Sequence, residues 1–299
     1  MKIKVNLFIT GAMKAGTTAL FSYFDQHPMV FTPLFKEPNY FSYPHTNTPY
    51  MGPGDRKEFI LSQWEYNNIY KLYKDENYLV DSSPEYLYYY KCARDIHKYN
   101  SNAKIIIILR NPVERMFSAY THLLRDGRET LPFIKSVELE ETRKEERFGT
   151  IWHYKSVSMY ADAVSNYYHY FSKNQIKVIL YDDFVKDSQS VLNELFNFLG
   201  LDCIQLKAIR RINVSGSPNR KLKLINTLRK NKTVKTFIGL LFPNKYSRRK
   251  IYDKIRSSNI HKIKIPNNEY NVLRKYFIKD IKQLETIINR DLSSWYKKR

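Results

Sequence analysis

Short apolar runs and amphipathic segments alternate along the first 200 residues of the chain. Four runs rich in Val, Ile and Leu predict buried strands; they lie near residues 5–9, 77–81, 104–110 and 176–182. Apolar residues recur at helical spacing in five other segments, near residues 17–26, 85–98, 112–125, 156–172 and 187–199. This alternation predicts an α/β fold in which helices flank a parallel sheet.

Single residues refine these elements. The run from Lys104 to Leu109 is apolar on both faces, which is typical of a central parallel strand, and Pro112 suits the first turn of the following helix. Gly200 is expected to end the helix near 187–199. A last helix near 268–289 should pack on the domain through an apolar face formed by Val272, Leu273, Tyr276, Ile281, Leu284 and Ile288.

The length of 299 residues fits one large domain. We expect an α/β core over 1–203, a basic and mostly helical segment over 204–265, and a helix over 266–299 that packs on the core. Residues 42–76 and 126–155 should form the long loops, with Glu138 to Arg147 as a solvated helix face.

The strand-to-helix turn within residues 7–20 (LFITGAMKAGTTAL) predicts an anion site. Gly11 and Gly16 allow a tight turn, and the following helix directs free N–H groups and its positive dipole end at the loop. A P-loop nucleotidase has a lysine directly after the second glycine, but Thr17 occupies that place and Lys14 lies inside the loop. The turn is therefore P-loop-like without matching the nucleotidase pattern.

Two further segments, KEPNYF at 36–41 and KIIIILRNPVERMFS at 104–118, occur in the order found in one family. With these motifs the chain resembles the sulfotransferases that use 3′-phosphoadenosine 5′-phosphosulfate (PAPS) and release PAP. The likeness is greatest to the glycan-modifying branch of heparan sulfate sulfotransferases and their bacterial relatives. It extends through VILYDDF at 178–184 and fades in the last third of the chain.

The resemblance implies two anion sites for the donor. It places Lys14 on the bridging oxygen between phosphate and sulfate, and Ala15, Gly16, Thr17 and Thr18 on the 5′-phosphate. It places Arg110 and Ser118, eight residues apart, on the 3′-phosphate. Arg220 and Lys221 lie in a segment that resembles the loop closing over the nucleotide. No metal is expected.

The resemblance also implies candidates for proton transfer. Glu37, in Lys36-Glu37-Pro38, corresponds to the base of the three-O-sulfating heparan enzymes. His122 follows Ser118 by one helical turn, as a histidine does in the N-sulfating enzymes, and is the second candidate. The chain departs from the family on the acceptor side, since Asn39, Ser42 and Ser82 stand where those enzymes carry a histidine, an aspartate and a lysine.

Charge points to an anionic partner. Fifty Lys and Arg against 29 Asp and Glu give +21, and residues 204–265 hold eighteen basic residues and one acid. This basic segment favours a charged glycan or a membrane surface over nucleic acid, for which no motif is visible. Its apolar patch at 237–243 (FIGLLFP) fits a buried elbow or, less well, a peripheral membrane contact.

The remaining features favour a cytoplasmic enzyme. The first strand starts within about five residues of Met1, and Cys92 and Cys203 lack metal-ligand spacing and are interpreted as packed thiols. The most favoured function is sulfation of a carbohydrate hydroxyl or, less favoured, an amine. Three alternatives remain open: sulfation of a small-molecule alcohol, a nucleoside-phosphate kinase, and a membrane- or polyanion-binding module that uses the basic segment.

Overall fold

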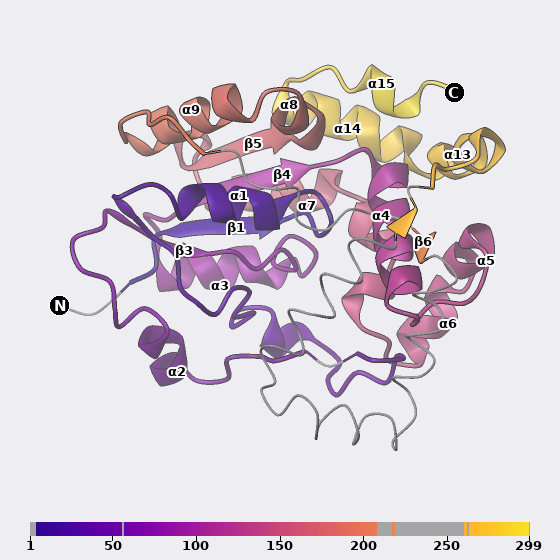
Figure 1. Ribbon diagram of the computed structural model, residues 1–299, viewed down its shortest axis with the longest axis horizontal. Helices are drawn as coiled ribbons and strands as arrows, with labels where there is room; N and C mark the ends of the chain where they lie inside the picture. Colours follow the sequence, from indigo (N-terminus) through magenta and orange to yellow (C-terminus); the bar gives the residue numbers. More distant parts are fainter. Residues whose placement is uncertain (1–3, 56, 208–216, 219–259, 262, 299) are drawn as a thin grey trace.

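Five parallel strands form the central sheet in the order β2-β3-β1-β4-β5 (Figure 1). The computed structural model describes residues 4–55, 57–207, 217–218, 260–261 and 263–298. The strands are β1 (Leu7–Gly11), β2 (Val30–Phe31), β3 (Tyr78–Asp81), β4 (Lys104–Leu109) and β5 (Ile176–Leu180). The predicted strands are confirmed with shifted ends, and β2 is too short for its pattern to have predicted it.

The strand order reverses beside β1. The chain passes from β1 to β2 and β3 on one side, and then crosses to β4 and β5 on the other. Isoleucines fill β4 because this strand is buried on both faces, so that residues 105–109 are fully covered. In open parallel sheets, ligands bind at the carboxyl ends of the strands where the order reverses. The carboxyl ends of β1 and β4 are therefore the expected place for a site.

Helices cover both faces of this sheet. Figure 1 shows α1 (Thr17–Phe24) in front of the strands and α7 (Ala161–Tyr170) behind them. The ring of Phe24 in α1 contacts that of Phe196 in α9 (Ser188–Leu199), with centroids 6.0 Å apart. Helix α7 packs against α3 (Lys91–Tyr99) and α14 (Ile278–Ile288). The other α-helices of the described residues are α2 (Gln63–Asn68), α4 (Pro112–Arg125), α5 (Phe133–Glu138), α6 (Glu140–Glu145), α8 (Tyr181–Lys186), α13 (Asn267–Leu273) and α15 (Ser293–Tyr296).

Two predicted helices and the end of one predicted strand need correction. The helix expected over 85–98 begins at Lys91, because Leu87 donates its N–H to Thr10 on β1 and residues 84–90 form turns. The segment 156–172 divides into a 3₁₀ turn and α7. Residues 181–182, expected in a strand, begin α8. By contrast, α4 has its predicted bounds, and Gly200 ends α9 in the left-handed conformation.

The C-terminal helix is broken, which changes its buried face. A 3₁₀ turn over Arg274–Phe277 separates α13 from α14. The turn rotates the helical face, so Val272 and Tyr276 are exposed while Leu273, Ile281 and Leu284 are buried as predicted. The segment thus packs on the core with a different set of residues from the one expected.

The two long loops are fastened together by one carboxylate. Asp55 accepts hydrogen bonds from the Arg128 guanidinium and the Gly149 N–H, both at 2.8 Å, and from Trp152 Nε1 at 3.0 Å. The interpretation of 138–147 as a solvated face is wrong for two residues, because Glu140 and Arg143 are buried. Arg143 pairs with Glu129 at 2.8 Å.

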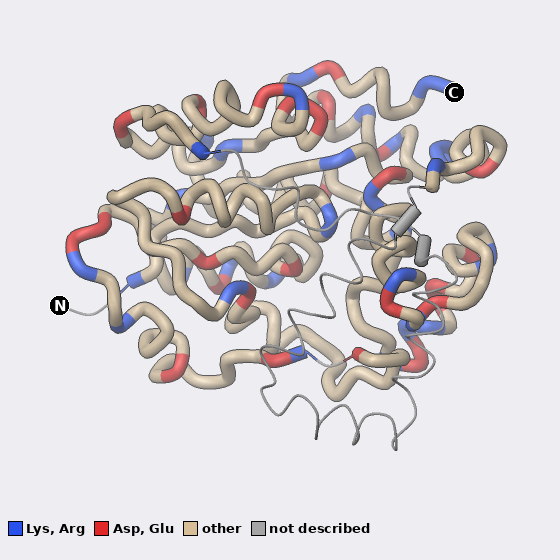
Figure 2. Tube along the Cα trace, in the orientation of Figure 1, with Lys and Arg blue, Asp and Glu red and all other residues tan. Residues whose placement is uncertain are grey.

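Other expectations concern the two cysteines, the basic segment and membrane-spanning helices. Cys92 is a buried thiol as predicted, but Cys203 is exposed. The basic segment lies largely outside the described residues. Over the part that is described, Lys and Arg are interspersed with Asp and Glu (Figure 2). None of the helices described is both long and apolar enough to cross a bilayer.

Candidate functional site

The predicted anion loop joins β1 to α1 at the carboxyl edge of the sheet. Lys14 and Gly16 have φ angles of 70° and 101°. A Cβ on Gly16 would lie 3.0 Å from the Tyr181 ring, and one on Gly11 would lie 2.5 Å from Leu87 Cβ. Glycine is required at both positions, because the chain must approach its neighbours closely and, at Gly16, adopt a left-handed turn.

Helix α1 presents its N-terminus to this loop. Gly16 is the N-cap residue, and no side chain caps α1. Thr17 and Thr18 begin the helix, so their backbone N–H groups belong to the first turn, where the free N–H groups of a helix can bind an anion. The phosphate-binding role of residues 15–18 stays a prediction.

Lys14 lies half-buried among other charged groups. Its Nζ is 3.3 Å from His122 Nδ1. Burial, followed by the positive charge of Arg125, lowers the pKa of Lys14 to about 7, against the opposing effects of Asp126 and Glu37. A lysine without a full countercharge is suited to an incoming phosphosulfate, which would supply that charge.

Helix α4 supplies the facing side of this cluster. Arg125 Nη2 donates to His122 Nδ1 at 2.6 Å, and His122 Nε2 is 3.6 Å from Asp126 Oδ2. Nδ1 therefore accepts and Nε2 carries the proton. His122 was predicted from the sequence and Arg125 and Asp126 were not, although their positions three and four residues after the histidine put them within reach on the same helix.

Arg110 connects the end of β4 to the anion loop. Its Nη1 donates to the Lys14 carbonyl at 3.4 Å, and its guanidinium lies 4.6 Å from the Tyr181 ring centroid. Its buried Nε has no hydrogen-bond partner within the described part of the chain. Ser118 lies two helical turns further along α4. An arginine with an unused buried donor fits a phosphate ligand, because a planar guanidinium binds phosphate with paired hydrogen bonds.

Glu37 approaches the cluster from the loop after β2. It has a φ of 63°, and its carboxylate contacts Lys36 Nζ at 2.5 Å with 37% of the side chain exposed. Burial raises the pKa of Glu37, but Lys36, together with Lys57 and Lys14, outweighs this effect and holds the pKa below its usual value. The carboxylate is thus ionised at neutral pH and lies within electrostatic range of Lys14.

The structure brings Lys14, Glu37, Arg110 and His122 to one edge of the sheet, with Ser118 on the same helix as His122. Arg220 and Lys221 lie outside the described residues. The positions that depart from the family pattern, Asn39, Ser42 and Ser82, are all buried. Among the residues described, no group of three His, Cys, Asp or Glu side chains is arranged to hold a metal ion.

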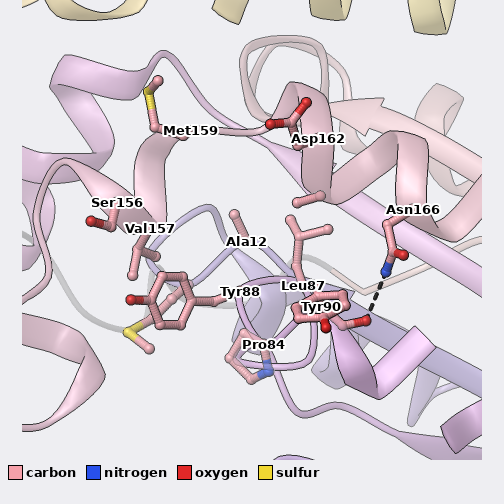
Figure 3. A pocket seen from close by; sticks show the side chains of 12 residues that line it. Ala12, Pro84, Leu87, Tyr88, Tyr90, Ser156, Val157, Met159, Asp162 and Asn166 are labelled. Atoms are coloured by element: carbon pink, nitrogen blue, oxygen red, sulfur yellow. Dashed lines mark hydrogen bonds between the residues drawn. The ribbon is translucent and has the colours of Figure 1, made fainter. Parts of the chain in front are cut away.

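A pocket of about 350 Å³ adjoins the anion loop (Figure 3). It is bounded by Ala12 and Met13 of the loop, by the turns after β3 and by α7. Its lining is largely apolar, and Tyr88 forms one wall. A smaller pocket of about 150 Å³ shares Tyr88 and is lined by Tyr50, Tyr89, Lys144, Arg147 and His153, among others. The smaller pocket is lined by residues of both long loops, and the larger one by the turns after β3, by the 3₁₀ turn that follows the second loop and by α7.

The sequence and the fold are both similar to those of known proteins. A family model described as "Sulfotransferase domain" matches residues 4–236. The crystal structure of a sulfotransferase from Alicyclobacillus acidocaldarius is 30% identical and superposes with a TM-score of 0.79, covering 99% of this chain and 100% of that chain.

Among curated proteins, the chain is similar to heparan sulfate glucosamine 3-O-sulfotransferase 6 of Mus musculus, with 25% identity over 193 residues that cover 64% of this chain and 51% of that protein. It is 24% identical to heparan sulfate glucosamine 3-O-sulfotransferase 3B1 of Homo sapiens, over 64% of this chain and 45% of that one. The chain therefore spans about half the length of these relatives.

Proposed function

Because the chain belongs to the sulfotransferase family, we propose that it transfers the sulfuryl group of PAPS to a hydroxyl of a carbohydrate. The observation that supports this most strongly is the convergence of Lys14, Arg110 and Glu37 on one edge of the sheet. An amine acceptor is the less favoured version of the same reaction.

The donor side fits PAPS by its chemistry. The loop and the N-terminus of α1 would bind the 5′-phosphate, and Lys14 would reach the oxygen that bridges phosphate and sulfate. Arg110 and Ser118 would bind the 3′-phosphate. Sulfuryl transfer, like phosphoryl transfer, depends mainly on in-line placement and on neutralising the charge of the leaving group. Lys14 would neutralise the negative charge that develops on the departing PAP.

On the acceptor side, Glu37 would act as general base. The acceptor oxygen forms a bond to sulfur while the bond between sulfur and the bridging oxygen breaks, and the hydroxyl proton passes to the Glu37 carboxylate. Its lowered pKa keeps Glu37 ionised before the acceptor binds. A positioned base is worth roughly 10²- to 10⁴-fold in rate. His122, whose Nδ1 faces Lys14, is the second candidate for this role.

One observation favours a second acceptor class. The largely apolar lining of the 350 Å³ pocket suits a small-molecule alcohol, and its volume falls within the roughly 300–1,000 Å³ typical of small-ligand sites. This alternative keeps the same donor site and the same reaction.

Donor binding and sulfate transfer test the proposal separately. In isothermal titration with PAP, Lys14→Ala and Arg110→Ala should weaken binding, whereas Lys135→Ala, which alters a surface pair with Glu138, should not. Glu37→Gln should keep PAP affinity and lose about two orders of magnitude or more in turnover. Equal PAP affinity in all variants would refute the donor site.

Labelled PAPS distinguishes the other functions. Sulfate should be transferred to a glycan panel without magnesium. A kinase would need magnesium and a nucleoside triphosphate, and a polyanion- or membrane-binding module would bind its partner without transferring sulfate. Transfer to small alcohols in preference to every glycan would favour the second acceptor class.

A further inference from the structure

The backbone that carries Glu37 is held in an unfavourable conformation. Glu37 and Asn39 both have positive φ angles, 63° and 52°, which side chains with a Cβ rarely adopt. Asn39 Nδ2 donates to the Glu37 carbonyl at 2.5 Å. The direction of the Glu37 side chain therefore depends on what holds the segment 37–41 in place.

Two hydroxyl groups from the neighbouring strand end hold this segment. The Asn39 N–H donates to Ser83 Oγ at 3.1 Å, and the Phe41 N–H donates to the Tyr86 hydroxyl at 3.4 Å. Each hydroxyl must therefore offer a lone pair to the segment and direct its own proton elsewhere. Both protons go to one group, Asp81 at the end of β3.

Asp81 is fully buried and accepts three hydrogen bonds. Ser83 Oγ donates to Oδ1 at 2.6 Å, and the Tyr86 and Tyr66 hydroxyls each donate to Oδ2 at 2.8 Å. A carboxylate only accepts, so it fixes the direction of every hydroxyl around it. Burial raises the pKa of Asp81 to about 6, against these three hydrogen bonds and Lys36, so the group is ionised at neutral pH.

From this geometry we infer that Asp81 is a positioning residue for Glu37. It orients the Ser83 and Tyr86 hydroxyls so that both accept backbone N–H groups of the segment 37–41 and thereby aim the proposed base. The inference rests on the proposed function, because Glu37 must be the group that acts on the acceptor.

The substitution Asp81→Asn tests the acceptor-only requirement. It keeps the shape of the side chain, but its NH₂ group donates where a carboxylate oxygen accepts. Whichever oxygen the NH₂ group replaces, either Ser83 or Tyr86 loses the acceptor for its proton, so that hydroxyl is no longer fixed in the orientation that accepts from the segment. Ser83→Ala removes one of the two links directly.

Both variants should lower kcat by roughly 10- to 100-fold, because small misplacements of a reacting group are costly, while PAP affinity stays at the wild-type value. Tyr66→Phe is the matched control. It removes the third donor to Asp81, keeps the ring, and touches no N–H of residues 37–41, so kcat should not change.

A double-mutant cycle separates positioning from a merely structural role. In a Glu37→Gln background, Asp81→Asn and Ser83→Ala should cause no further loss of kcat, because the group they position is gone. An equal loss in both backgrounds, or wild-type kcat in both single variants, would overturn the inference. Wild-type turnover in Glu37→Gln alone would refute the proposed base, and the positioning role with it.

Discussion

At the scale of single residues, charge burial determines how the site responds to pH. Lys14 carries a pKa lowered to about 7, mainly by burial and by Arg125, in a protein without bound donor. Asp81 carries a pKa raised to about 6, mainly by burial. Each group is displaced towards its neutral form, which is the usual effect of removing a charge from water.

Lys14 should take up a proton when the donor binds. At about pH 8 the lysine is mostly neutral in the free protein, and the phosphates of PAP would raise its pKa and protonate it. Uptake should approach one proton there and fall towards zero near pH 5.5, where Lys14 is already charged. Titration calorimetry in buffers of different ionisation enthalpy measures this. Lys14→Met is the control, and unchanged uptake in that variant would assign the proton to another group.

Asp81 should make the protein less stable as pH rises. Between about pH 4 and 6 the folded protein keeps a proton on Asp81 that the unfolded chain has lost, so the free energy of unfolding falls through this window. Relative to Asp81→Asn, the wild type should lose about 2 kcal/mol between pH 4 and 7. Urea unfolding of both proteins at several pH values provides the measurement. A difference that does not vary with pH would contradict the raised pKa.

At the scale of elements, the unit formed by β1, the glycine turn and α1 contributes a strand to the sheet and also forms the proposed anion site. The sequence predicted β1, the glycine turn, α1 and the lysine inside the turn, because spacing along one stretch of chain determines them. It also predicted α4 with its bounds, since Pro112 fixes the start of that helix and Asn111 caps it. The sequence pattern was sufficient to predict an element where that element depends on residues that are close together in the chain.

Gly16→Ala should damage both stability and donor binding. Alanine at φ 101° is strained and its Cβ meets the Tyr181 ring at 3.0 Å, so we expect a loss of about 1–3 kcal/mol and weaker PAP binding. Gly200→Ala is the matched control, because φ is 67° there but no atom lies within 4 Å of the added Cβ. It should cost about 1 kcal/mol and leave PAP affinity unchanged. Equal effects of the two variants on PAP affinity would show that the turn conformation is not needed for the anion.

Asp55→Ala should release the two long loops from each other. The buried carboxylate pairs with Arg128 and accepts from Gly149 and Trp152, so its loss leaves three donors unsatisfied and should cost about 3 kcal/mol. PAP affinity should persist while the KM for the acceptor rises. Glu138→Ala, which removes a surface pair with Lys135, is the control. An unchanged KM for the acceptor in Asp55→Ala would show that the contacts between these loops do not contribute to acceptor binding.

The elements and partners that the sequence did not predict depend on contacts between distant segments. Leu87 does not join a helix because its N–H donates to Thr10 on β1. Glu140 is buried because it accepts from the Ser156 N–H at 2.9 Å. Asp81 was predicted only as the end of a strand, because one of its three donors, Tyr66, comes from α2, while Ser83 and Tyr86 follow β3. Arg125 was within reach of sequence reasoning, because helical spacing alone relates it to His122.

At the scale of the whole molecule, Tyr88 is shared by two pockets of different character. The larger one has Asp162 as its charged lining residue and is otherwise mostly apolar. The smaller one is lined by Lys144 and Arg147, and by His153, whose pKa burial lowers. Lys144 is already paired with Glu140 and Glu141. Arg147 is exposed, and no ion pair joins it to another of the described residues.

This difference between the pockets predicts an acceptor with a neutral ring beside an acidic group. If the proposed function holds, the ring would lie against Tyr88 in the larger pocket and a carboxylate would reach Arg147 in the smaller one. Arg147→Ala should then raise the KM for an acceptor with a uronic acid by about 5-fold, as one partly solvated charge pair is worth about 1 kcal/mol, and leave a neutral acceptor unaffected.

Tyr88→Ala should raise the KM for both acceptors, because it removes the wall that the two pockets share. Steady-state sulfation of a matched pair of disaccharides, one with glucuronic acid and one with glucose at the same position, measures both effects, with Lys135→Ala as the control for surface charge. The carboxylate contact should also weaken with added salt, since Arg147 is open to solvent. Equal KM changes for the two disaccharides in Arg147→Ala would show that the smaller pocket does not recognise the carboxylate. Any effect of the positive charge of the chain on the acceptor would then come from basic residues outside this pocket.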